Sequence, residues 1–207
     1  GTKIYGKAIQ INLSVTKGKG VQYVLMGMDE RSEYGFDELD CHKMFGNSED
    51  MPDIYLTDNK DEFSVNVFPS YPAIYDIGLY IGNPGKVEIN LNNISVLPEN
   101  VNVFVEDKVN NKFYDFCQDS KVETLLKSGT TEDFRIHIIK AIPINSIDKE
   151  YSGIYLWQDK GRILLYGDMI HKLKQVIVKD KNGNTVIQED YTPYQVMSKA
   201  LNQGIYK

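Results

Sequence analysis

The sequence lacks a basic excess and any long apolar run. Its 23 lysines and arginines are outnumbered by 29 aspartates and glutamates, which gives a formal net charge of −6. A phosphate backbone requires a concentrated positive surface, and the nearest basic run, His171–Lys174, is interpreted as the start of a solvated strand. No stretch approaches the roughly 20 apolar residues that span a bilayer. The sequence therefore argues against a nucleic-acid partner and against a transmembrane segment.

Cysteine and histidine are also scarce. Cys41 and Cys117 are too few for a disulfide framework, and both lie among strand-like residues, so we expect buried free thiols. His42 follows Cys41 directly, so on a strand the two side chains point to opposite faces and cannot form a dyad. Nothing in the sequence brings Cys117 and His137 together. The chain also lacks a Gly-x-Ser-x-Gly elbow, a His-Glu-x-x-His pair and a phosphate-binding loop. We expect no enzyme and no cofactor.

The segments that are present alternate apolar and polar residues with a period of two. Such runs are Ile9–Val15, Val87–Leu91, Val101–Val105 and Phe134–Ile138. Turn signals rich in Gly and Asn separate them. Helical signals are weak, with one turn each expected at Val122–Lys127 and Tyr194–Leu201. Many short alternating strands indicate a sandwich or barrel.

We therefore expect an all-β fold with two antiparallel domains. The polar stretch Asn145–Glu150 follows Pro143, and a new alternating run begins at Ile154. This predicts a jelly-roll-like β-sandwich over residues 1–145 and a small immunoglobulin-like β-sandwich over 150–207. The chain opens on Gly1 with no charged-then-apolar signal segment. We interpret that glycine as the remnant of a removed tag or signal.

An ordered set of motifs resembles a known module. Phe36–Lys43 fits the pattern FD-x-x-D-x-x-K, Val105–Lys108 is similar to LEDK, and Asp133–Arg135 is similar to DRF. From about Ile9 to Ile139, this order resembles a β-sandwich that recurs before the sorting tail of Bacteroidetes surface proteins. In that module an early acidic pair and an arginine before the last strand recur. The resemblance implies a structural ion pair between Arg135 and Asp37 or Asp40, because a bidentate Arg–carboxylate pair suits charges near a core.

The C-terminal part resembles the sorting domain of type IX secretion. Val176–Val186 fits the hairpin pattern V-x-V-x-D-x-x-G-x-x-V, in which Asp180 and Gly183 occupy the Asp and Gly positions. Leu201–Tyr206 is similar to L-x-x-G-x-Y, with Gly204 and Tyr206 at the matched positions. The family continues through a final strand, whereas this sequence stops at Lys207, so that strand is expected to be missing. The resemblance implies recognition by the secretion machinery and a secreted or outer-membrane surface location.

Two ligand hypotheses come from clustered side chains. Six acidic residues lie between Asp29 and Asp40, and calcium prefers such oxygen ligands. Their spacing does not match an EF-hand, so an acidic loop with ion pairs is favoured; the weak calcium candidates are Asp29, Glu30 and Asp37.

Carbohydrate or a host protein is the other candidate ligand. Tyr71, Tyr75 and Tyr80 lie close in sequence, but Tyr75 and Tyr80 would face opposite sides of one strand. Aromatic residues on strands more often serve packing, which is also favoured for Trp157 beside Tyr155. The function favoured by the whole sequence is a non-catalytic spacer of an exported surface protein. An adhesin module that binds glycan or host protein, and the accessory end of a secreted hydrolase, are the alternatives.

Overall fold

The protein is an all-β chain, as the sequence predicts. A computed structural model describes residues 9–46, 48–58, 60–93, 97–98, 100–117, 121–140, 142–143, 154–159, 162–167, 170–194 and 197–198. Within these ranges the regular structure consists of strands and one short 3-10 turn, η3 (Ile170–Lys172). The described part of the chain contains no apolar helix of membrane-spanning length.

The chain divides into two compact units. The first comprises Gly1–Asn110 and Tyr114–Lys140, and the second comprises Asn111–Phe113 and Ala141–Lys207. Among the described residues, the large sheet contains eleven strands. They are β1 (Ile9–Lys17), β2 (Gly20–Met28), β3 (Cys41–His42), β4 (Asp53–Thr57), β5 (Glu62–Phe68), β6 (Ala73–Ile81), β7 (Gly85–Asn92), β8 (Val101–Asp107), β9 (Lys112–Asp115), β10 (Lys121–Leu126) and β11 (Gly129–Lys140).

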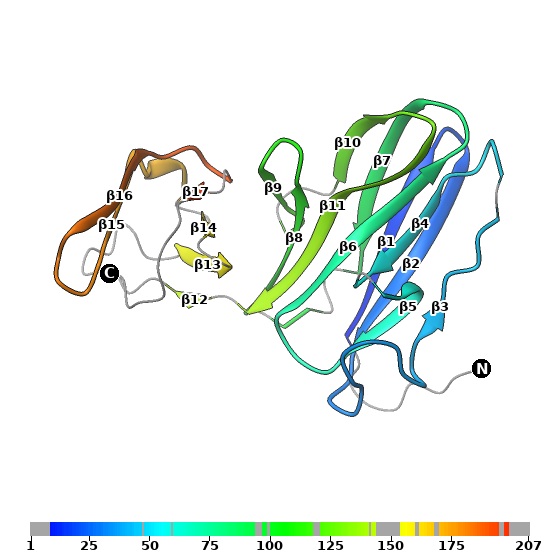
Figure 1. Ribbon diagram of the computed structural model, residues 1–207, viewed down its shortest axis with the longest axis horizontal. Coiled ribbons are helices and arrows are strands. Elements are labelled where there is room, and N and C mark those ends of the chain that lie inside the picture. The colour runs from blue at the N-terminus through cyan, green and yellow to red at the C-terminus, as the bar shows by residue number, and fades with distance from the viewer. Residues whose placement is uncertain are drawn as a thin grey trace. The chain divides into compact units, whose positions relative to one another are not determined.

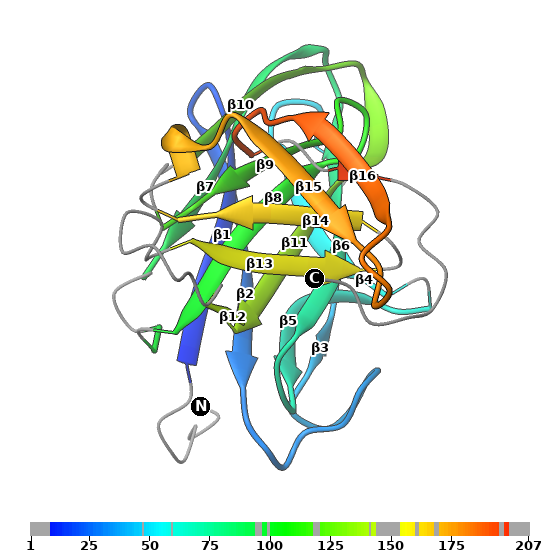
Figure 2. The same ribbon diagram turned by 90° about the vertical axis from the view of Figure 1, so that its left-hand side faces the viewer.

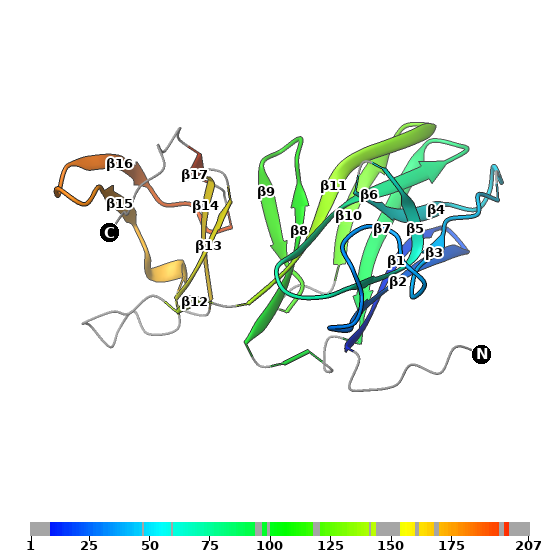
Figure 3. The ribbon, with the colours of Figure 1, turned by 60° about the horizontal axis from the view of Figure 1, so that its bottom comes forward.

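The order across the large sheet is β10-β7-β1-β2-β5-β4-β6-β11-β8-β9, and β3 pairs with β5. Figures 1 and 3 show this sheet strongly curled, with β6 and β11 crossing over β1, β2 and β7. Strands β2 and β5 are parallel, with Leu25 opposite Val65, so the sheet is mixed and the prediction of purely antiparallel sheets is wrong. The 33 residues between Met28 and Glu62 (61 − 29 + 1 = 33) include the crossover through β3 and β4 that allows this pairing.

The helical turn expected at Val122–Lys127 is also wrong, because Lys121–Leu126 forms strand β10 against β7. Val122 is buried opposite Ile89, whereas Leu125 is exposed. Tertiary pairing therefore overrides a weak local preference.

The alternation predicted from sequence gives each central strand a core face and an outer face. On β4, Ile54 and Leu56 belong to the hydrophobic core, which also takes Ile77 from β6 and Ile136 from β11. Tyr55 and the other odd-numbered β4 residues therefore point to the outer face. Side chains directly opposite each other in antiparallel strands share a face, so the pairing register of the strands identifies the rest of the outer face.

The described part of the second unit forms two small sheets. One has the order β12 (Ile142–Pro143), β13 (Tyr155–Asp159), β14 (Arg162–Tyr166) and β17 (Met197–Ser198). The other is the hairpin of β15 (Gln175–Lys179) and β16 (Thr185–Asp190), which Figure 2 shows together with β13 and β14. Trp157 is only 4% exposed, so the packing role favoured by the sequence is confirmed.

Candidate functional site

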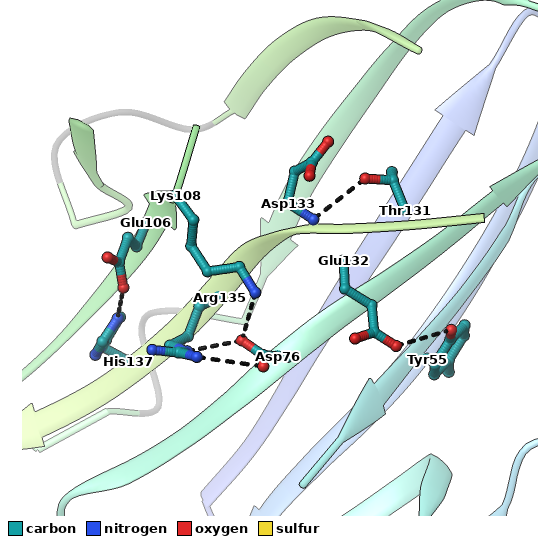
Figure 4. A network of polar contacts seen from close by, with 9 residues as sticks. All are labelled: Tyr55, Asp76, Glu106, Lys108, Thr131, Glu132, Asp133, Arg135 and His137. Carbon is teal, nitrogen blue, oxygen red and sulfur yellow. Dashed lines mark hydrogen bonds and ion pairs between the residues drawn. The ribbon is translucent and has the colours of Figure 1, made fainter. Parts of the chain in front are cut away.

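A row of polar residues crosses the outer face of the large sheet. The register places Thr57 opposite Asp76, Asp76 opposite Arg135, and Arg135 opposite Glu106. Arg135 donates from Nε to Oδ1 of Asp76 at 2.7 Å and from a terminal nitrogen to Oδ2 at 3.2 Å. Lys108 Nζ donates to the same Oδ1 at 3.0 Å. Two cations from β11 and the end of β8 thus converge on one carboxylate of β6, as Figure 4 shows.

This arrangement corrects the partner predicted for Arg135. The carboxylate that faces its guanidinium is that of Asp76, because β11 pairs directly with β6. Asp37 and Asp40 instead accept hydrogen bonds from backbone amides. Asp37 accepts from Glu33 at 2.7 Å and from Leu39 at 2.6 Å, and Asp40 accepts from Asp37 and from Val67 on β5. The predicted bidentate pair therefore exists with a different acid.

The electrostatics of Asp76 follow from these contacts. Burial by itself would raise the pKa of Asp76, but the hydrogen bonds from Arg135 and Lys108 outweigh that effect, and the pKa lies below its ordinary value. The carboxylate is thus held ionised. A side chain this tightly paired acts as a connection between strands.

A second polar pair lies further along the same strands. His137 Nε2 and Glu106 Oε2 are 2.8 Å apart, and their side chains are 0% and 3% exposed. The cysteines are exposed, which makes the expectation of buried thiols wrong. Cys117 lies in the turn after β9, where its amide donates to Asp115, and Cys41 lies on the two-residue strand β3.

The segment Phe36–Lys43, which carries the first motif, is fixed against the sheet by its motif residues Asp40 and Lys43 and by the pairing of Cys41 and His42 with β5. Asp40 accepts from the amides of Val67 on β5 at 2.7 Å and of Asp37 at 2.9 Å. Lys43 forms an ion pair with Asp53 at the start of β4, and both side chains are less than a tenth exposed. The motif therefore ties the long β2–β4 connection to β4 and β5.

A hollow of about 640 Å³ lies beside this tied segment. Besides Lys43, it is lined by His42, Thr57, Lys60, Asp61, Glu62 and Glu132. Sequence reasoning missed this site, because its walls come from segments up to 90 residues apart (132 − 42 = 90). The one signal available was the break in alternation at Glu132 and Asp133, where β11 contains a bulge between Thr131 and Phe134.

The calcium candidates are engaged in other contacts. Asp29 forms an ion pair with Arg31 at 2.6 Å, and the side-chain and backbone hydrogen bonds from Arg31 lower the pKa of Asp29 to about 2. Asp37 accepts backbone amides, and Glu30 is exposed. Among the described residues, no three His, Cys, Asp or Glu side chains gather as a metal site would require. The ion pair at Asp29 agrees with the favoured reading of an acidic loop.

The three tyrosines do not form a common surface. Tyr75 is 6% exposed within the core, and Tyr71 packs against that core while remaining half-buried. Tyr80 lies opposite Asp53 on the outer face. The structure therefore separates the three residues that the sequence suggested as a ligand platform.

The predicted C-terminal hairpin is present. Asp180 Oδ1 accepts from the amides of Asn182 at 2.8 Å and Asn184 at 2.9 Å, and Gly183 has a φ of 87°. The aspartate and the glycine therefore shape the turn between β15 and β16. Gly204 and Tyr206 lie outside the described residues.

Comparison with known proteins gives no further identification: no family model, no curated protein and no solved structure matches the chain.

Proposed function

We propose that this chain is a non-catalytic structural module of an exported cell-surface protein. In this proposal the first unit is a jelly-roll-like sandwich that serves as a spacer. The second unit is a small immunoglobulin-like domain of the sorting type, recognised by type IX secretion machinery. The resemblance to Bacteroidetes surface proteins is the basis for the cellular part of the proposal.

One observation carries the structural part. Four ionisable residues of the three motifs form ion pairs that connect strands. Glu106 binds His137, and Lys108 and Arg135 both bind Asp76. Lys43 of the first motif binds Asp53. Side chains held in such ion pairs stabilise the fold, and a spacer requires a stable fold.

The sorting role has separate support in the β15–β16 hairpin. The turn at Asp180 and Gly183 has the geometry that the hairpin pattern requires, with an acid capping the turn and a residue at positive φ. Such a hairpin offers a compact element for recognition by a partner.

An export assay tests this proposal. The full chain, joined behind a signal peptide and a fluorescent reporter, is expressed in a Bacteroidetes strain with type IX machinery and in a strain without it. We expect surface fluorescence only in the first strain, and we expect Gly183→Pro to reduce it while Gly46→Ala leaves it unchanged. Gly46 is a suitable control because a Cβ there meets no neighbouring atom within 4 Å. Equal surface fluorescence in both strains, or none in either, would contradict the sorting role.

A further inference from the structure

The hollow beside β4 and β5 is the second feature of the outer face. Glu62 lies directly opposite Thr57, so both side chains are on the outer face at the β4–β5 turn. Lys60 and Asp61 come from that turn, and their amides are held by Asp58 Oδ1 at 3.0 Å each. Asp58 therefore holds the backbone of Lys60 and Asp61 in place beside the hollow.

A β-bulge supplies the opposite wall. The register of β11 against β6 shifts between Thr131 and Phe134, which turns Glu132 towards β4. Tyr55 Oη donates to Glu132 Oε1 at 3.4 Å, as Figure 4 shows. Burial, followed by the nearby carboxylates of Glu132 and Glu62, raises the pKa of Tyr55 to about 12. Both carboxylates thus lie near one phenol, and bulges commonly re-aim side chains at binding sites.

The third wall is the segment fixed by Asp40 and Lys43. His42 lines the hollow, and its ring stacks on Phe36 with centroids 3.7 Å apart and an angle of 4° between the planes. Phe36 is 43% exposed. Phe45 packs edge-on against Tyr55 at 5.4 Å, so a second partly exposed ring lies close to the same side. Because this segment is bonded to β4 and β5, the wall exists before any ligand arrives.

The chemistry of the lining selects among ligands. Lys43 is neutralised by Asp53, which leaves Lys60 as a donor and three carboxylates, Asp61, Glu62 and Glu132, as acceptors. Hydroxyl groups donate strongly to carboxylates and accept from ammonium groups. An anionic ligand would meet the excess of carboxylates, and a bare metal ion would lack a converging ligand set among the described residues. A neutral molecule with many hydroxyl groups and an apolar face can accept a hydrogen bond from Lys60, donate to the carboxylates and contact the aromatic rings.

We propose that this hollow is a binding site for neutral saccharides. The sugar hydroxyls would donate to Glu62 and Glu132 and accept from Lys60, while the sugar ring would contact the Phe36–His42 stack. This inference goes beyond the spacer role and does not depend on export.

The test begins with a printed array of defined neutral, sialylated and sulfated oligosaccharides, probed with the full chain. Calorimetric titration with the best neutral oligosaccharide follows, on the wild type and on the variants Glu62→Gln and Glu132→Gln. We expect retention of neutral glycans, and a loss of affinity of about tenfold or more in each variant, since a charge-assisted hydrogen bond is replaced. Lys121 lies on β10, where it forms exposed ion pairs and does not line the hollow. The control variant Lys121→Met should therefore bind as the wild type does.

Circular dichroism on each variant separates lost binding from lost folding, and Lys60→Met provides a second lining variant on an exposed side chain. Three results would overturn the inference. They are retention of no neutral glycan, affinity unchanged in the folded lining variants, and retention only of sulfated or sialylated glycans. Any of these would leave the export result untouched, so the two proposals fail separately.

Discussion

At the scale of single residues, several side chains at the motif positions form buried or partly buried ion pairs. Arg135 is 28% exposed and Asp76 is 10% exposed, and two hydrogen bonds join them. Sequence reasoning anticipated such a pair but assigned the wrong acid. Asp76 lies within the strongly apolar strand β6, with no pattern marking it, and only the β6–β11 register reveals it.

Replacing Arg135 tests this contact directly. Arg135→Met retains the aliphatic packing but leaves the Asp76 carboxylate with Lys108 alone. We expect the free energy of unfolding to fall by about 2 kcal/mol, below the range for fully buried pairs because the arginine is partly exposed. Urea unfolding at pH 7 measures the change. Lys121→Met, which removes exposed ion pairs with Glu88 and Glu123, should leave the midpoint nearly unchanged. Equal effects of the two substitutions would contradict the assignment.

The lowered pKa of Asp76 gives the pH dependence of stability a definite sign. A carboxyl group whose pKa is lower in the folded state contributes stability above its unfolded pKa of about 4 and loses it as pH falls through the folded value. We expect the wild type to be more stable than Asp76→Asn at pH 6. The gap should narrow as the pH falls towards about 2. Urea unfolding across this range measures the gap, and a gap that widens with acid would show the opposite sign.

At the scale of strands, the sequence predicted the elements better than their partners. The alternating runs starting at Ile9, Val87, Val101 and Phe134 all form strands, β1, β7, β8 and β11. Period-two alternation is a local signal, so a reader of the sequence can find it. The parallel pairing of β2 with β5 depends on a crossover through distant residues, and nothing local records it. The same limit explains why the sequence suggested purely antiparallel sheets.

Gly78 on β6 leaves the space that the ring of Tyr55 occupies. It lies opposite Tyr55, and a Cβ at this position would lie 2.0 Å from the tyrosine ring. The ring is 3% exposed and packs against Phe45, so it has little room to move. We expect Gly78→Ala to cost about 3 kcal/mol, at the upper end for overpacking. Thermal and urea unfolding should show Gly46→Ala as near neutral; a tolerated Gly78→Ala would contradict the packing.

The β15–β16 hairpin depends on the backbone at Gly183. Its φ of 87° is costly for a residue with a Cβ, and nothing lies within 4 Å of that position, so any cost is conformational. We expect Gly183→Ala to destabilise the hairpin by about 1 kcal/mol, and Gly183→Asn to cost less because asparagine adopts positive φ more readily. Amide hydrogen exchange at Val178 and Ile187 reports the local opening. Identical exchange in both variants and the wild type would count against a role for the turn.

At the scale of the whole molecule, the all-β class could be read from the sequence, whereas the hollow could not. The class follows from repeated local alternation and the scarcity of helical signals. The hollow requires β3, the β4–β5 turn and the bulge of β11 to come together, and each of these regions contributes between one and four residues. Tyr71, Tyr75 and Tyr80, which are close in sequence, are separated by the strand pleat and by burial. Proximity along the chain was therefore a poor guide to a ligand site.

We infer that the motif residues, Lys43 included, stabilise the fold, whereas the other charged residues of the hollow remain available to a ligand. A urea-unfolding series at pH 7 compares the two sets. The motif variants are Asp40→Asn, Lys43→Met, Glu106→Gln and Lys108→Met, and the hollow variants are Lys60→Met and Asp61→Asn. We expect the motif variants with the most buried pairs, Lys43→Met and Glu106→Gln, to lose about 3 kcal/mol, and the hollow variants to stay within about 0.5 kcal/mol of the wild type. A series in which the motif variants are as stable as the hollow variants would contradict the account.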